Sequence, residues 1–177
     1  MNIKSMNPLI IATFVCGLIS ATPALAENET NVYFKGEIVE SACGIAPESI
    51  DQTIELGQSP THIFQAQGDR STPVPFDIKL VECDTTVAST ADFTFLSNPD
   101  TSGNLFSVEG GATGVGVRIL HNGLPINNGD VAASNVLVDG TNIVSFSAAY
   151  EANTDVATTP VTAGNAESWA LLRVAYQ

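Results

Sequence analysis

Residues Thr30 to Ala42 read TNVYFKGEIVESA and end directly before Cys43. The segment has no Pro and no two-residue turn signal, so it predicts one long strand. Lys35 and Glu37 lie on one face of that strand, since side chains alternate sides along an extended chain. The opposite, mostly apolar face carries Thr30, Val32, Phe34, Gly36 and Ile38.

This predicted strand is longer than the domain that follows it. Its residues, at about 3.3 Å each, span about 43 Å. A compact domain of this size is about 38 Å across by the usual radius-of-gyration scaling. We therefore expect part of the segment to extend beyond its own domain. An apolar strand left free at a chain end promotes aggregation unless another molecule binds it.

The first 26 residues have the three parts of a secretory signal peptide. A short polar region with Lys4 precedes the apolar run Leu9 to Ile19, and small residues lead to Ala24-Leu25-Ala26. We expect cleavage after Ala26. The apolar run is shorter than the ~20 residues that span a bilayer, so we expect export and no direct membrane insertion.

The mature chain has a strongly acidic composition. Removal of residues 1–26 leaves 151 residues, enough for one domain with a sizeable core. It also removes Lys4, so that five basic residues face nineteen acidic ones and the net charge is −14. A charge of this sign argues against binding to nucleic acid and to anionic lipid.

Two cysteines remain after cleavage, Cys43 and Cys83. An even count in an exported chain predicts a disulfide between them. In the chain-entropy treatment, a disulfide that closes a loop of this length contributes about 4 kcal/mol to the free energy of unfolding. We expect no metal and no other cofactor, because only His62 and His121 could join the two sulfurs and neither has a ligand-like spacing.

The rest of the chain consists of short Val-, Ile- and Phe-rich runs between turn signals such as Asn122-Gly123 and Asp139-Gly140. This pattern predicts an all-β protein, an antiparallel β-sandwich. The predicted strands are Ile50 to Leu56, Val74 to Val81, Phe93 to Leu96, Val115 to Leu120, Val136 to Val138, Ile143 to Tyr150 and Ala170 to Tyr176. Both faces of the last strand are mostly apolar, so we expect it to be largely buried.

Motifs that imitate functional sites are weak, and we predict that the chain is not an enzyme. The run from Asn98 to Glu109 matches a calcium loop in part, but strand-like residues and glycines flank it where helices should be. Gly110 to Gly116 lacks the Lys-Ser/Thr of a phosphate loop, and small residues that let two backbones approach explain it better. No serine-hydrolase elbow is present. Two alternatives stay open, a self-contained secreted sandwich that binds sugar or protein, and a hydrolase with an unrecognised carboxylate pair.

Taken together, these features resemble the type 1-like pilins of the chaperone/usher pathway. The resemblance covers essentially the whole mature chain. Besides the signal peptide it rests on FKGEIVESAC at Phe34 to Cys43, DQTIELG at Asp51 to Gly57, VECD at Val81 to Asp84, GVGVRIL at Gly114 to Leu120, and the penultimate Tyr176. A single pilin domain with an extension resembles a shaft or adaptor subunit, because adhesins of that family carry a second, lectin domain and lack the extension.

The resemblance implies an incomplete immunoglobulin-like sandwich that a donor strand from a neighbouring subunit completes. It divides the chain into a signal peptide (1–26), a donor-strand extension (27–40) and a pilin domain (41–177). The donor face is then Thr30, Val32, Phe34, Gly36 and Ile38. The last strand, with Ala170, Leu172, Val174 and Tyr176, borders the groove, and the Gln177 carboxylate anchors a periplasmic chaperone. The implied partners are that chaperone, an outer-membrane usher and identical or related subunits, in a surface fimbria that supports adhesion.

Overall fold

The computed structural model describes residues 29–177, so the expected signal peptide lies outside the described residues. The chain forms two units, one ending at Glu37 and one running from Ile38 to Gln177. Residues 29–40 adopt no helix or strand and are exposed. The strand predicted from Thr30 to Ala42 is thus absent here. A strand needs a neighbouring edge for its N–H and C=O groups. Among residues 29–177, no helix is long and apolar enough to span a membrane.

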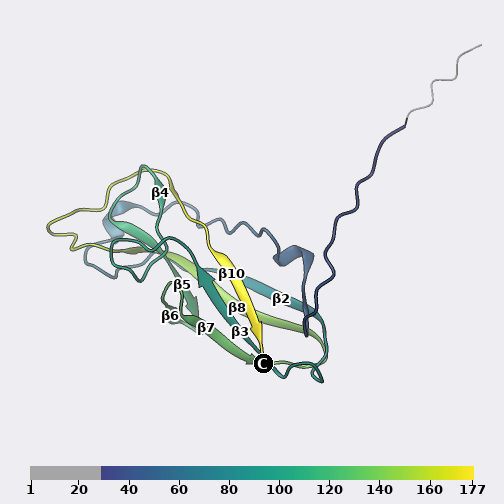
Figure 1. The fold of residues 1–177 in the computed structure, drawn as a ribbon. Helices are drawn as coiled ribbons and strands as arrows, with labels where there is room; N and C mark the ends of the chain where they lie inside the picture. Colours follow the sequence, from purple (N-terminus) through teal and green to yellow (C-terminus); the bar gives the residue numbers. More distant parts are fainter. Residues whose placement is uncertain (1–28) are drawn as a thin grey trace, which may run out of the picture. The chain divides into compact units, whose positions relative to one another are not determined.

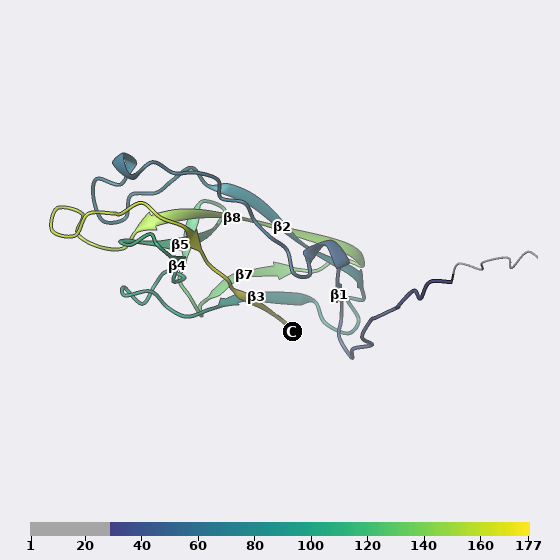
Figure 2. The ribbon, with the colours of Figure 1, turned by 90° about the horizontal axis from the view of Figure 1, so that it is seen from above.

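The domain is a two-layer antiparallel sandwich, with β2 and β8 in one layer and β3 and β7 in the other (Figures 1 and 2). In spatial order the first sheet contains β1 (Gly44–Ile45), β2 (Val74–Cys83), β8 (Gly140–Ala152), β5 (Val115–His121) and β6 (Leu124–Ile126). The second contains β10 (Leu171–Tyr176), β3 (Thr90–Leu96) and β7 (Val131–Val136). The remaining elements are the ribbon of β4 (Glu109–Gly110) with β9 (Ala166–Glu167) and two short 3-10 turns, η1 (Pro47–Ser49) and η2 (Thr61–Ile63).

The core lies between the two layers and is built from alternate strand residues. In β3 the inward positions Ala91, Phe93 and Phe95 are buried, while the residues between them are partly exposed. Phe95 packs edge-on against Phe146 of β8, with ring centroids 5.0 Å apart. Edge-to-face aromatic pairs of this kind add to the free energy gained by burying their area.

A disulfide joins Cys43 to Cys83, as predicted. Both residues are buried, and they connect the start of the domain to the last residue of β2. Just beyond the bond, the Asp84 amide donates to the Ala42 carbonyl over 2.9 Å. The first residues of the domain are therefore fixed to β2 by a covalent bond as well as by β1.

The structure corrects three of the strand predictions. Residues 51–59 are not a strand, because their backbone makes no hydrogen bond within the described chain. The strand expected at Val136 to Val138 is instead β7, which ends at Val136. Its body, VAASNV, is too rich in small and polar residues to show the usual alternation. The third correction concerns the burial of the last strand, which is described below together with the groove.

Two groups of glycines serve the purposes expected from the sequence. Asn122 and Gly123 both have positive φ, 51° and 77°, and form the two-residue turn between β5 and β6. A Cβ on Gly110 would collide with the backbone of Asn165, and one on Gly164 with that of Gly111. The glycine-rich run thus lets β4 and the segment before β9 approach closely.

Candidate functional site: an apolar groove beside the last strand

One edge of β10 is unpaired in the described part of the chain. β10 pairs with β3 from Leu171 to Tyr176, and no strand lies on its other side. Residues 51–59 form the opposite wall, and their backbone is also free of hydrogen bonds. Between these walls lies a groove of about 1350 Å³. Its two sides therefore offer unpaired N–H and C=O groups, which can pair with an added strand.

The floor of the groove is apolar and comes from both sheets. Its side chains are Phe76, Ile78, Phe95, Phe106, Val115, Val117, Ile119, Ala148 and Tyr150. Alternate residues of β2, β5 and β8 point into it, since strand side chains alternate. An apolar surface of this extent, open to water, is expected of an interaction site.

The rim of the groove is acidic. Asp51, Glu55 and Glu167 line it, and no Lys or Arg does. Glu167 stands directly opposite Glu109 in the β4–β9 ribbon. Burial, together with the charges of Glu55 and Glu167, raises the pKa of the Tyr150 phenol, whose hydroxyl donates to the Ala166 carbonyl over 2.7 Å. Among residues 29–177, no group of three or more potential ligands could hold a metal ion.

The last strand is less buried than the sequence predicted. Its inward residues Leu172, Val174 and Tyr176 are half-buried and pack against the core. Its outward side chain Leu171 is 58% exposed, and the neighbouring Trp169 is 56% exposed. The expectation of a largely buried strand is wrong because β10 forms a sheet edge beside an unfilled groove. Of the predicted groove residues, Ala170 and Leu172 line the groove.

The chain end is held in the second sheet. The Gln177 carboxylate accepts hydrogen bonds from the Ser89 and Thr90 amides, over 2.8 and 2.9 Å. The Gln177 side-chain amide donates to Asp92 over 2.7 Å. Burial raises the pKa of the Tyr176 phenol, whose hydroxyl donates to the Cys43 carbonyl over 3.4 Å. The last two residues are thus tied to both layers of the sandwich.

The predicted donor residues all lie in the exposed, unpaired stretch of the chain. Thr30, Val32, Phe34 and Gly36 belong to the unit that ends at Glu37, and Ile38 begins the next unit. The Phe34 side chain is 92% exposed. A Cβ on Gly36 would meet no atom within 4 Å. The apolar face predicted from the sequence is therefore available to another molecule.

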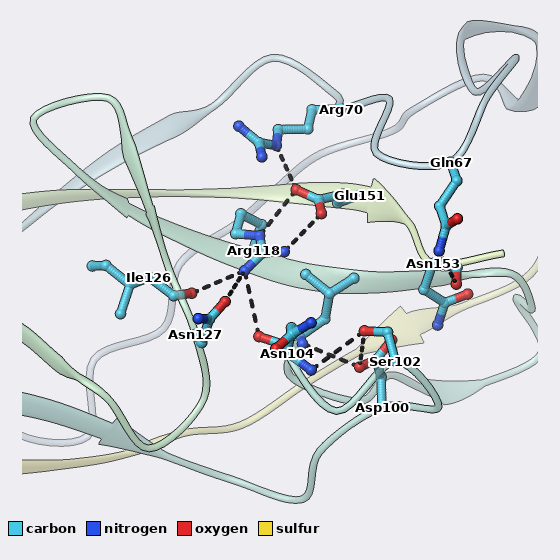
Figure 3. A network of polar contacts seen from close by, with 11 residues as sticks. Gln67, Arg70, Asp100, Ser102, Asn104, Arg118, Ile126, Asn127, Glu151 and Asn153 are labelled. Atoms are coloured by element: carbon cyan, nitrogen blue, oxygen red, sulfur yellow. Dashed lines mark hydrogen bonds and ion pairs between the residues drawn. The ribbon is translucent and has the colours of Figure 1, made fainter.

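A buried polar network lies on the reverse face of the groove floor, where Arg118 of β5 and Glu151 of β8 meet (Figure 3). Arg118 also donates to the carbonyls of Asn104 and Ile126, and Arg70 pairs with Glu151. Arg118 lies between the floor residues Val117 and Ile119, and Glu151 follows the floor residue Tyr150, so their side chains point away from the groove. The network connects the floor strands to three neighbouring segments.

Sequence reasoning missed the groove floor, the wall at residues 51–59 and this polar network. A charge in the middle of the apolar run VGVRILH was a usable signal, since Arg118 needs a buried partner there. The partner itself could not be chosen among nineteen acidic residues. The floor residues looked like ordinary core, because an open groove and a closed core have the same alternation.

Comparisons with known proteins give the family of the chain. A sequence model described as "Fimbrial protein" matches residues 32–177. The chain belongs to this family. A type-1 fimbrial protein A chain of Escherichia coli is 36% identical over the whole of both chains. The type 1 fimbrial subunit of Klebsiella pneumoniae is 35% identical over the same share.

Solved structures place this fimbrial subunit in the same fold. A chaperone-usher pilus structure matches with a TM-score of 0.75 and 27% identity, covering 88% of this chain and all of the other. The P pilus rod subunit PapA matches with a TM-score of 0.68 and 26% identity, covering 77% of this chain and all of the other. The predicted immunoglobulin-like sandwich is confirmed. The chain is a structural subunit of a fimbria, and the alternative of a self-contained secreted binding module is not supported.

Proposed function

We propose that this subunit polymerises by donor-strand exchange, in which residues Thr30–Ile38 of one copy fill the groove of the next. The observation that carries the proposal is the free edge of β10 beside a groove of about 1350 Å³. The same chain carries an exposed, unpaired segment with an alternating apolar face. Each copy therefore lacks one strand and offers one.

The free energy of this pairing comes from two sources. Main-chain hydrogen bonds satisfy the open edges of β10 and of residues 51–59, whatever the donor sequence. The donor's apolar side chains then enter the floor. Burying a side chain such as Phe34, which is 92% exposed in the free extension, contributes about 1.5–3 kcal/mol. Alternate side chains of this kind select the partner.

Before exchange, a periplasmic chaperone occupies the groove, and an outer-membrane usher directs its replacement. The Gln177 carboxylate is the proposed anchor for the chaperone. It is held in place by the Ser89 and Thr90 amides, so a basic group on the chaperone would meet it in a fixed position. The assembled fimbria is exposed at the cell surface and supports adhesion. We assign no catalytic activity to it.

The proposal can be tested with the full chain exported alongside its chaperone and usher. Phe34→Asp places a charge on the donor face, and Asn31→Asp adds the same charge on the opposite face. We expect the Phe34→Asp subunit to fold and to form no fibres, and the Asn31→Asp subunit to form fibres of normal length. Electron microscopy and size exclusion provide the measurements.

A clean monomer from the purified mature wild-type chain would contradict the proposal. So would normal fibres from Phe34→Asp. Antibody labelling of the fibres also shows where this subunit lies in the assembly. Label along whole fibres identifies a shaft subunit, and label at the tips identifies an adaptor.

A further inference from the structure

Arg173 differs from the other basic residues of the domain. In the unit Ile38–Gln177, Arg70 and Arg118 pair with Glu151 and Lys79 pairs with Glu48, whereas Arg173 has no ion pair. It lies on the outward face of β10, at the free edge of the sheet. A strand added at that edge would bring its own outward residues beside Arg173.

The sandwich limits how a donor can lie. Immunoglobulin-like sheets are antiparallel, and antiparallel pairs are the more stable kind. We therefore place the donor antiparallel to β10. Its apolar face must point into the groove, and a shift of one residue would turn that face outward. Only registers that differ by an even number of residues remain, and the apolar face by itself does not choose among them.

Charges on the outward face exclude two of these registers. In one, Lys35 of the donor stands directly opposite Arg173. In the register shifted by four residues from it, Glu37 reaches the position of Glu167, which lies beyond the start of β10 in the β4–β9 ribbon and already faces Glu109. Like charges directly opposite destabilise a strand pair.

Strand length excludes the outer registers. A further shift toward the chain end would place Val32 beyond Gln177, where β10 has no residue to pair with it. A further shift the other way would place Tyr176 opposite position 26, which the expected cleavage removes, and Val174 opposite position 28, outside the apolar face that begins at Thr30. One register lies between the two that the charges exclude.

We propose that the donor of a second copy occupies this register, in which its Tyr33 lies directly opposite Arg173 on the outer face of the sheet. The proposal rests on the donor-strand function above and names what sets the register at that site. In the groove, Phe34 then lies opposite Leu172 and Gly36 opposite Ala170. Leu172 and Phe95 are paired residues of β10 and β3 and both line the groove, so Phe34 enters an aromatic part of it.

The outward pair has a physical basis of its own. An Arg guanidinium packs over the face of a tyrosine ring, and its charge is attracted by the ring. Lys35 falls opposite Leu171, where its methylene stem covers an exposed apolar side chain. The groove therefore binds the apolar side chains of the donor, while the contact between Tyr33 and Arg173 selects one of the registers in which these side chains face inward.

Cysteine pairs in the full exported chain test the register. Directly opposite residues of antiparallel strands have Cα atoms about 4.5–5.5 Å apart, within disulfide range. Residues offset by two are about 7–8 Å apart or more, too far for a disulfide. We expect Tyr33→Cys with Arg173→Cys to give a covalent ladder on a non-reducing gel. Lys35→Cys or Asn31→Cys, each combined with Arg173→Cys, should give at least tenfold less.

Each outcome has a defined reading. A ladder from either shifted pair would overturn the register and leave donor-strand exchange intact. An intramolecular disulfide in the Tyr33→Cys/Arg173→Cys monomer would show that the extension fills the groove of its own chain. That result would overturn the proposal that a second copy supplies the donor strand. Wild-type chains that form no fibres would instead overturn the function proposed above.

A second measurement covers the case in which the cysteines themselves block assembly. The thermal dissociation of fibres is compared for Tyr33→Ala, Arg173→Ala and the double variant. Because each single change already removes the same contact, we expect the double variant to dissociate at the temperature of the weaker single one. If the decrease in dissociation temperature of the double variant equals the sum of the decreases of the two single variants, the pairing of Tyr33 with Arg173 is overturned.

Discussion

Arg118 and Glu151 form a two-pronged ion pair, with Nε 3.0 Å from Oε2 and Nη2 2.8 Å from Oε1. Their residues are only 7% and 6% exposed. The Arg118 Nη1 also donates to the Ile126 carbonyl over 3.1 Å. The pair thus joins β5, β8 and the end of β6 directly behind the floor of the groove.

Removing one member of this pair should destabilise the fold strongly. Arg118→Met leaves the buried Glu151 carboxylate without its main partner, and we expect a loss of about 3–5 kcal/mol in the free energy of unfolding. Urea denaturation of the exported subunit measures it. The matched control is Arg118→Met with Glu151→Leu, which removes both charges and should recover most of the loss. A single variant as stable as wild type would contradict this account.

The same carboxylate predicts how stability depends on pH. Burial alone would raise the pKa of Glu151, but hydrogen bonds from Arg118 and Arg70 outweigh it and hold the pKa below 4.5. Since the folded pKa is the lower one, its contribution is complete above about pH 4.5 and is lost as pH falls through the folded pKa. We expect wild type to lose more stability than Glu151→Gln between pH 5 and about pH 3. Parallel curves for the two proteins would refute this.

The disulfide should be required for accumulation of the subunit. Replacing Cys43 or Cys83 by Ser removes the bond, and we expect a loss of about 2–5 kcal/mol. Pulse labelling should show normal export followed by degradation in the periplasm. Mass spectrometry of exported wild type should find no free thiol, and two free thiols would contradict the bond.

Gly116 marks a close approach that a methyl group should disrupt. A Cβ there would lie 2.8 Å from the Leu105 Cβ and 3.1 Å from the Phe106 carbonyl oxygen. We expect Gly116→Ala to cost about 1–3 kcal/mol by overpacking. Gly44→Ala is the control, because its Cβ would meet no atom closer than 3.7 Å. Equal melting temperatures for the two variants would contradict the prediction.

Gly36→Arg separates folding from donation. Nothing lies within 4 Å of a Cβ on Gly36, so the variant should fold and keep its disulfide. In a neighbour's groove the same side chain would bury an unpaired charge, at a cost of several kcal/mol. We expect a subunit that accepts a donor but cannot donate, and that shortens fibres when mixed with wild type. Fibre length by electron microscopy and subunit level by immunoblot are the readouts, and normal fibres that contain the variant would exclude the donor assignment.

The strands that the sequence predicted well are those with strong side-chain alternation. Val74 to Val81 and Ile143 to Tyr150 were found as parts of β2 and β8, each longer than predicted. Their extra residues, such as Gly140 to Asn142, pair because a neighbouring strand continues past the apolar pattern. Propensity cannot reveal where a neighbour ends.

The candidate site was harder to predict because it is defined by a missing element. Ile50 to Leu56 has the composition of a strand, yet it has no strand beside it in the free domain. The exposure of Leu171 has the same cause. Both patterns fit a sandwich with every strand present, so the sequence led to the right fold class and to incorrect burial along one edge.

The Cys43–Cys83 bond also decides where a mechanical load would enter the domain. β1 is only two residues long, and tension on the chain ahead of Cys43 could peel its few hydrogen bonds apart one after another. The covalent bond passes that tension to Cys83, the last residue of the ten-residue β2. β2 is paired with β8 along most of its length, so many hydrogen bonds resist together. In the donor-strand assembly proposed above, force that enters through the N-terminal extension is thereby carried by the long β2–β8 ladder instead of the two-residue β1–β2 ladder.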